Sequence, residues 1–414
     1  MSIFDVLALF GGLALFLFGM NVMGDGLTRA AGGKMERILE KLTSTPIKGV
    51  LLGAAVTAVI QSSSATTVMV VGFVNSGIMK LRQAVGIIMG ANIGTTVTSW
   101  ILSLSGIQGD SIWIQMLKPS SFSPILAVIG IAFLMFSKNE KKHDIGMIFL
   151  GFTILMYGMD AMSGAVAPLA DVPEFANVLL MFSNPVLGMI VGALFTAIIQ
   201  SSSASVGILQ ALCMTGAVTY GTALPIIMGQ NIGTCVTALL SSIGAKKNAK
   251  RAAFVHLYFN LIGTILFMIV FYSINAFVNF GVLQDMATPA GIAVIHSIFN
   301  ILTTIVLLPF GKGLEKLATL TIREKEEPVE EIAELVPLKH LDARFLEQPA
   351  FAVTQSMDVM NQMAGYSAEA LYDSLELMKD YSEEKWQRVE ALEDIVDKYE
   401  DELGTYLAKV SGKE

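Results

Sequence analysis

The chain has 414 residues, of which 53% are apolar and only 15% are charged, and its mean hydropathy is +0.63. This composition excludes a soluble enzyme and an intrinsically disordered chain. Residues 1–311 contain 15 basic and 11 acidic side chains, whereas residues 312–414 contain 12 and 24. The sequence therefore predicts an all-α polytopic membrane protein with an acidic, water-facing tail.

Seven apolar stretches are long enough to cross the roughly 30 Å hydrocarbon core of a bilayer. They lie at residues 3–22, 84–104, 121–137, 144–166, 222–243, 252–276 and 289–311. The first stretch lacks the basic start and cleavage site of a signal peptide, so we expect it to remain as a membrane helix. Lys and Arg in the connecting segments predict an outside N-terminus and a cytoplasmic C-terminus.

An internal duplication relates the two halves of this membrane region. Residues 61–65, Gln-Ser-Ser-Ser-Ala, recur at 200–204, and residues 92–95, Asn-Ile-Gly-Thr, recur at 231–234. Both pairs are separated by 139 positions, so the alignment needs no gap. A fixed offset over this length indicates two copies of one structural unit.

The two copies are predicted to face opposite sides of the membrane. The loop after the first apolar stretch is basic, whereas its counterpart at residues 167–184 contains Asp171 and Glu174 and no Lys or Arg. Three predicted spans also separate the two serine motifs, and an odd number of crossings reverses orientation. We therefore expect inverted-topology repeats.

Each serine motif is flanked by apolar segments that are too short to span. Residues 46–60 and 65–79 would each form about 22 Å of helix, against a core of roughly 30 Å. We expect two re-entrant helical hairpins, at residues 46–80 and 185–218. Their Gln-Ser-Ser-Ser tips would lie near the bilayer midplane, where irregular backbone must be buried in protein or line a wet cavity.

The tip residues suit an oxyanion. Each motif combines a carboxamide, three hydroxyls and the free N–H groups of a helix N-terminus. No Asp, Glu, His, Lys or Arg lies between Gly49 and Met79 or between Phe175 and Ala245, so a cation such as Na⁺ must neutralise a bound anion. The two Asn-Ile-Gly-Thr segments are natural sodium sites, because glycine frees backbone carbonyls beside Asn and Thr oxygens. The alternative for all these segments is close helix packing by small residues.

These paired motifs resemble those of the type II sodium/phosphate cotransporters and their bacterial relatives, over roughly residues 1–315. The resemblance implies a secondary active transporter that imports inorganic phosphate by symport with sodium and works by alternating access. It implies phosphate contacts at Gln61, Ser62, Ser63, Gln200, Ser201 and Ser202. It implies sodium ligands at Ser64, Asn92, Thr95, Ser203, Asn231 and Thr234.

Two other functions remain open. One is sodium-coupled transport of sulfate, arsenate or a dicarboxylate, because hydroxyl donors tolerate several oxyanions. The other is a membrane phosphate sensor without turnover. In each case we expect membrane lipid as the surroundings, a homodimer as a candidate assembly, and neither enzymatic activity nor a nucleic-acid partner.

The chain is predicted to divide into four parts. These are membrane repeat 1 (residues 1–143), repeat 2 with the helices that follow it (144–311), an acidic linker (312–350) and a helical tail (351–414). The tail shows apolar residues at helical spacing and predicts a cytoplasmic pair of antiparallel helices. It is similar to the opening helices of PhoU-like domains, which implies a bacterial inner-membrane protein.

Several single residues have structural interpretations. Cys213 and Cys235 are expected in the apolar core. His256 and His296 are interpreted as packing or polar-bridging residues. Asp160 stands where the first copy has Asn21, and two interpretations are open: a cation or proton carrier, and an interfacial aspartate.

Overall fold

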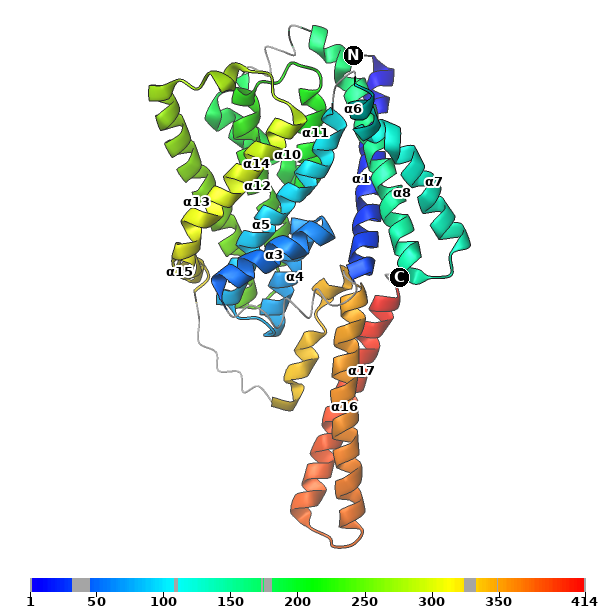
Figure 1. The fold of residues 1–414 in the computed structure, drawn as a ribbon. Coiled ribbons are helices and arrows are strands. Elements are labelled where there is room, and N and C mark those ends of the chain that lie inside the picture. Colours follow the sequence, from blue (N-terminus) through cyan, green and yellow to red (C-terminus); the bar gives the residue numbers. More distant parts are fainter. Residues whose placement is uncertain are drawn as a thin grey trace.

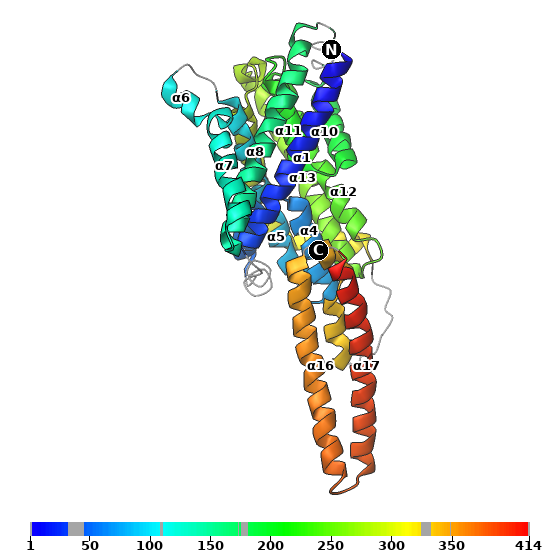
Figure 2. The same cartoon turned by 90° about the vertical axis from the view of Figure 1, so that its right-hand side faces the viewer.

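A computed structural model describes residues 2–31, 45–107, 111–172, 174, 181–323, 333–347 and 349–412. Regular structure in these ranges is helical, with one isolated bridge between Thr219 and Met286. The helices form an elongated body, and a long helical pair projects from one of its ends (Figures 1 and 2).

Seven helices within the described ranges are long and apolar enough to cross a membrane, as predicted. They are α1 (Ile3–Ala31), α5 (Leu81–Ser103), α7 (Pro119–Phe136), α8 (Glu140–Val166), α12 (Tyr220–Ser241), α13 (Lys247–Val278) and α14 (Pro289–Leu307). Each contains all or most of one predicted stretch, because a run of about 20 apolar residues can satisfy its backbone in a bilayer only as a helix.

Four shorter helices form two equivalent pairs. They are α3 (Pro46–Ile60) and α4 (Ser63–Ser76), followed by α10 (Pro185–Ile199) and α11 (Ser202–Cys213). Proline begins both α3 and α10, where its missing N–H is not needed. In Figure 1, α3 and α4 lie near the end of the body that carries the projecting helices, and α10 and α11 lie toward the other end.

Close backbone contacts recur at the offset of 139. A Cβ atom added to Gly53 of α3 would lie 2.1 Å from the Ile87 carbonyl oxygen of α5. A Cβ atom added to Gly192 of α10 would lie 2.2 Å from the Ile226 carbonyl oxygen of α12. Only glycine allows these approaches. The duplicated sequence therefore builds the same crossing twice, α3 on α5 and α10 on α12.

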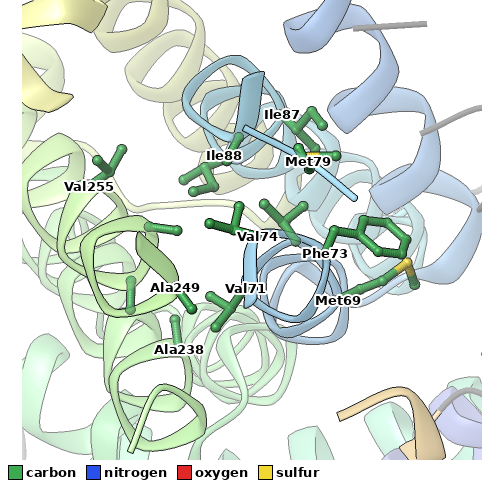
Figure 3. Packing of buried hydrophobic residues seen from close by; sticks show 14 of the residues in the cluster. Met69, Val71, Phe73, Val74, Met79, Ile87, Ile88, Ala238, Ala249 and Val255 are labelled. Carbon is green, nitrogen blue, oxygen red and sulfur yellow. The ribbon is translucent and has the colours of Figure 1, made fainter. Parts of the chain in front are cut away.

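The largest hydrophobic core joins the first short pair to helices from the second half of the chain (Figure 3). Its buried members include Met69, Val71, Phe73, Ile87, Ile88, Ala238, Ala249 and Val255, from α4, α5, α12 and α13. Side chains from both halves of the chain therefore contribute to one core.

The projecting pair consists of α16 (Pro349–Leu377) and α17 (Glu383–Ser411), which are antiparallel as expected from their apolar spacing (Figure 2). The preceding region is more helical than a linker. Helix α15 (Gly311–Thr321) follows α14, and the 3₁₀ helices η5 (Ala333–His340) and η6 (Ala343–Glu347) lead into α16. Most of the acidic run that suggested a linker, residues 324–332, lies outside the described residues.

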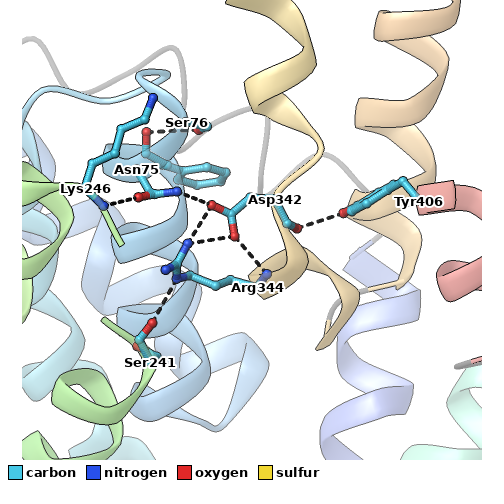
Figure 4. A network of polar contacts seen from close by, with 8 residues as sticks. Asn75, Ser76, Ser241, Lys246, Asp342, Arg344 and Tyr406 are labelled. Atoms are coloured by element: carbon cyan, nitrogen blue, oxygen red, sulfur yellow. Dashed lines mark hydrogen bonds and ion pairs between the residues drawn. The ribbon is translucent and has the colours of Figure 1, made fainter. Parts of the chain in front are cut away.

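A polar network attaches this tail to the membrane body (Figure 4). The buried Asp342 carboxylate pairs with Arg344 at 2.7 Å and accepts a hydrogen bond from Asn75 of α4 at 2.6 Å. Arg344 also donates to the Ser241 carbonyl at 2.9 Å, and Tyr406 of α17 donates to the Asp342 carbonyl at 3.0 Å. The network therefore joins α17 and the segment that leads into α16 to α4 and α12.

Aromatic packing strengthens the same attachment. The Phe345 ring lies against Gly72 of α4, so closely that a Cβ atom there would be 2.7 Å from Cε1. Phe345 also packs on Phe73 and Phe351, with ring centroids 5.4 and 4.8 Å apart. The end of α4 is thus held by buried apolar contacts as well as by the ion pair.

Replacing Asp342 by Ala should release the tail from α4. The substitution leaves the Arg344 guanidinium, whose side chain is 16% exposed, without its carboxylate, and costs about 3 kcal/mol locally. Hydrogen exchange should become faster in η6 and in the last turn of α4. Asp373→Ala is the matched control, because it removes a contact to the exposed Arg388 within the tail and should leave exchange in η6 unchanged.

Candidate functional site

Both short pairs bend at the glutamine of their serine motif. Gln61 has a φ of 59° and ends α3, and Gln200 has a φ of 57° and ends α10. A positive φ is uncommon for a residue that carries a Cβ atom, and it interrupts the helical hydrogen bonds. The two glutamines therefore form the same sharp bend, and the serines that follow begin the next helix.

Serine caps each of these new helices. The Ser62 hydroxyl accepts a hydrogen bond from the Ala65 amide at 3.1 Å, and the Ser201 hydroxyl accepts one from the Ala204 amide at 3.2 Å. Capping uses a lone pair of the hydroxyl and leaves its hydrogen to donate elsewhere. The first amides of each helix lack an intrahelical acceptor and lie at the positive end of its dipole. Each bend thus offers uncharged donors suited to an oxyanion.

Buried hydroxyl pairs brace both bends. Thr57 of α3 donates to Thr66 of α4 at 3.0 Å, and Thr196 of α10 donates to Ser205 of α11 at 2.8 Å. All four residues are almost fully buried. These equivalent bonds fix the angle between the two short helices of each pair, so the serines are held in place before any ligand binds.

The two carboxamides differ. Gln61 is 4% exposed, its Oε1 accepts a hydrogen bond from Thr98 of α5 at 3.0 Å, and its Nε2 donates to the Ala58 carbonyl. Gln200 is exposed, and its carboxamide makes no hydrogen bond to any residue that the structure describes. The remaining serines are similar in the two copies, since Ser63 and Ser202 are both 5% exposed.

The candidate sodium residues lie along α5 and α12. The Thr95 hydroxyl donates to the Ala91 carbonyl at 3.0 Å, and the Thr234 hydroxyl donates to the Gln230 carbonyl at 2.9 Å. Each bond uses the hydroxyl hydrogen and leaves oxygen lone pairs for a cation. Ser64 is partly buried, and Ser203 is 6% exposed, at the starts of α4 and α11.

Asn92 and Asn231 do not have equivalent surroundings. Asn92 donates Nδ2 to the Ile88 carbonyl at 2.8 Å, which uses no lone pair of its Oδ1. Asn231 donates Nδ2 to Asn300 at 2.9 Å, and its Oδ1 lies 3.2 Å from His296 Nε2. The carbonyl oxygen of Asn92 is therefore the more available of the two for a cation.

His296 bridges α14 to α12, which confirms its interpretation as a polar-bridging residue. It belongs to a second repeated pattern that the sequence comparison missed: His256-Leu-Tyr-Phe-Asn260 in α13 recurs 40 positions later as His296-Ser-Ile-Phe-Asn300 in α14. His256 is 1% exposed, and neither ring nitrogen has a hydrogen-bond partner among the described residues. Self-comparison at short offsets would have found this pattern.

Gln210 is another buried polar residue that sequence reasoning missed. Its Nε2 donates to the Ser99 carbonyl at 3.0 Å and to the Pro289 carbonyl at 3.1 Å, so it joins α11 to α5 and α14. The equivalent position in the first copy is Val71, which lies in the apolar core with Ala238, the equivalent of Ser99 (Figure 3). Since Thr98 binds Gln61 and Ser99 binds Gln210, one turn of α5 contacts elements of both copies.

The two cysteines and Asp160 lie in simple surroundings. Cys213 and Cys235 are free and buried, as expected. Asp160 is exposed near the end of α8 that is distant from the tail, a location that favours the interfacial interpretation.

Comparison with known proteins identifies the family. Residues 15–164 and 169–285 match the Na+/Pi-cotransporter family. The chain belongs to this family of transporters. With seven apolar helices in the part of the chain that the structure describes, this member of the Na+/Pi-cotransporter family is a multi-pass membrane protein.

Relatives of three kinds match this family member. It is 31% identical over 315 residues to the uncharacterized protein YqeW of Bacillus subtilis, covering 76% of this chain and 97% of YqeW. It is 26% identical over 370 residues to the putative inorganic phosphate export protein YjbB of Escherichia coli K12, covering 86% of this chain and 64% of that relative. It is 23% identical over 379 residues to the rat sodium-dependent phosphate transport protein 2A, covering 62% of this chain and 59% of that relative. No solved structure matches.

Proposed function

We propose that this protein is a secondary active transporter that moves inorganic phosphate together with sodium. The observation that carries this proposal is the duplicated bend, in which an uncharged glutamine and a serine cap meet at the start of a helix. The motif residues offer an oxyanion hydroxyl and amide donors but no charge, so accompanying cations supply the neutralising charge.

The proposed membrane arrangement is an inverted repeat with two re-entrant hairpins, α3–α4 and α10–α11. Support comes from their locations toward opposite ends of the body in Figure 1 and from their lengths of at most 15 residues. The tail lies beside the end of α4, and the basic loops of the chain support a cytoplasmic location for that end in a bacterial cell.

The proposed phosphate contacts are Gln61, Ser62, Ser63, Gln200, Ser201 and Ser202, and the proposed sodium ligands are Ser64, Asn92, Thr95, Ser203, Asn231 and Thr234. Asn92 is favoured over Asn231 as a sodium ligand, because residues of α14 already contact both Nδ2 and Oδ1 of Asn231. The two halves therefore contribute unequally to cation binding.

Import of phosphate follows if sodium flows inward, because symport couples the two ions in one direction. Export is a second candidate, favoured by the similarity to YjbB, a putative phosphate export protein whose match extends over 86% of this chain. Uptake and efflux should both be measured in proteoliposomes with a sodium gradient of either direction. Accumulation of radiolabelled phosphate inside the vesicles under an inward sodium gradient supports symport. Movement of phosphate in the direction opposite to sodium flow supports export by exchange.

The same vesicles distinguish sodium-coupled phosphate transport from two alternatives. One is transport of a wider range of oxyanions, and the other is a sensor function. Transport that continues without sodium would reject coupling, and competition by sulfate or arsenate would widen the substrate. Binding of phosphate without accumulation in either gradient would favour a membrane sensor. These outcomes can be told apart, because sodium independence and competition by other oxyanions are both measured as flux, whereas a sensor shows binding without flux.

Replacing Thr234 by Val should change the dependence of uptake on sodium concentration more than its dependence on phosphate concentration. The side chains have nearly the same shape, but valine lacks the oxygen whose lone pairs remain available beside the Gln230 carbonyl. We expect the sodium concentration for half-maximal uptake to rise about tenfold, the effect of losing roughly 1.4 kcal/mol. Thr319→Val on α15 is the control, and an unchanged sodium curve in Thr234→Val would exclude Thr234 as a ligand.

A further inference from the structure

The threonine that holds Gln61 has a counterpart in the second copy. Thr98 of α5 and Thr237 of α12 are 139 positions apart, in the same register as the two serine motifs. Thr98 donates to the Gln61 carboxamide, whereas the Thr237 hydroxyl is buried and has no hydrogen-bond partner among the described residues. The contact made in the first copy is therefore not made between the equivalent residues of the second.

The backbone of the two bends and the contacts of their serine caps are otherwise alike. The bends have almost equal φ values at Gln61 and Gln200, the serine caps differ by 0.1 Å, and both hydroxyl braces are formed. Glycine contacts of α10 with α12 reproduce those of α3 with α5. The backbone that would let Gln200 reach α12 is thus already built.

An unpaired buried hydroxyl is unfavourable. Leaving such a group without a partner costs about 1–3 kcal/mol, and nearly all buried polar groups in native proteins are paired. The exposed Gln200 carboxamide is the group that stands where Gln61 stands in the first copy. Its Oε1 is a suitable acceptor for the Thr237 hydroxyl.

We propose that Thr237 is the docking partner of the Gln200 carboxamide, and that this bond forms when the second bend closes on phosphate and sodium. Thr237 then acts as a positioning residue: it holds Oε1 of Gln200 and orients Nε2, which has two hydrogens, so that one of them donates to the anion. The bond between Thr98 and Gln61 shows the closed arrangement, and the second copy has the open arrangement. This inference rests on the proposed transport function.

Thr237→Val is the variant that tests the proposal, and Thr98→Val is its counterpart. In the absence of ligand, Thr237→Val should leave thermal stability equal or raise it, because it removes an unpaired hydroxyl, whereas Thr98→Val should lower it. With sodium and phosphate, hydrogen exchange at residues 196–205 should slow in the unmodified protein and in Thr237→Ser. Thr237→Val should lose this protection and require about five- to tenfold more phosphate for half-maximal uptake.

Thr304→Val is the matched control, because the Thr304 hydroxyl of α14 is also buried and unpaired among the described residues but is not at the equivalent of Thr98. In Thr304→Val, hydrogen exchange at residues 196–205 should slow with sodium and phosphate as it does in the unmodified protein. Full ligand-induced protection in Thr237→Val would overturn the proposal. If the unmodified protein neither binds nor moves phosphate, the transport function itself fails, which is a separate result.

Discussion

Gln200→Gly is expected to reduce sodium-dependent phosphate uptake at least about a hundredfold. Glycine accepts the positive φ of 57° at this position, so the bend between α10 and α11 is preserved while the carboxamide is removed. The substitution removes a donor to the anion, a hydrogen bond to a charged group that contributes about 1.5–3 kcal/mol, and the neutral bond proposed with Thr237, which contributes about 0.5–1.5 kcal/mol. Uptake of radiolabelled phosphate into proteoliposomes measures the effect.

The control for this substitution is Asn279→Gly. Asn279 ends α13 with a φ of 50° and lies outside both bends, so it tests the same exchange at a positive-φ position. Uptake by Asn279→Gly should match the unmodified protein. Equal uptake by Gln200→Gly and Asn279→Gly would place the substrate away from the second bend.

Gly53→Ala is expected to cause a large loss of stability. The added methyl would lie 2.1 Å from the Ile87 carbonyl oxygen, which belongs to rigid helical backbone, so α3 and α5 must separate. Overpacking of this kind costs about 3 kcal/mol or more. Gly192→Ala should also lower stability, because its methyl would lie 2.2 Å from the Ile226 carbonyl oxygen. Thermal unfolding in detergent gives the measurement.

Gly11→Ala in α1 and Gly164→Ala in α8 provide controls. No described atom lies within 4 Å of a Cβ added at either position, and alanine favours a helix over glycine by about 1 kcal/mol. Their melting temperatures should stay equal or rise. A melting temperature of Gly53→Ala equal to that of these controls would contradict the close crossing of α3 and α5.

Local signals explain which parts of the fold could be predicted. The bounds of α3 agree with the expected residues 46–60, because Pro46 can begin a helix and the apolar run stops at the polar Gln61. The tail forms the expected pair of helices for a similar reason, since its apolar residues recur at helical spacing. The start of α4 came two residues earlier than expected, because Ser62 caps the helix.

Contacts between distant segments explain what could not be predicted. The bond from Thr98 to Gln61 joins residues 37 positions apart, and the bond from Asn75 to Asp342 joins residues 267 positions apart. Nothing in a local pattern of hydropathy or capping specifies such pairs. The family resemblance likewise treated Asn92 and Asn231 as equals, although the second is bound by α14.

The amino-acid sequence by itself determined the seven apolar helices, the two copies and the residues at which the short helices break. These features depend on hydrophobicity, helix propensity and repeated motifs, which act over a few turns of chain. Only the tertiary structure decided that the tail packs on α4 and that Asn231 is hydrogen-bonded to α14. It also decided that Gln61 is hydrogen-bonded to Thr98 while Gln200 is exposed. Those outcomes depend on side chains meeting across helices, where burial makes each unpaired polar group costly.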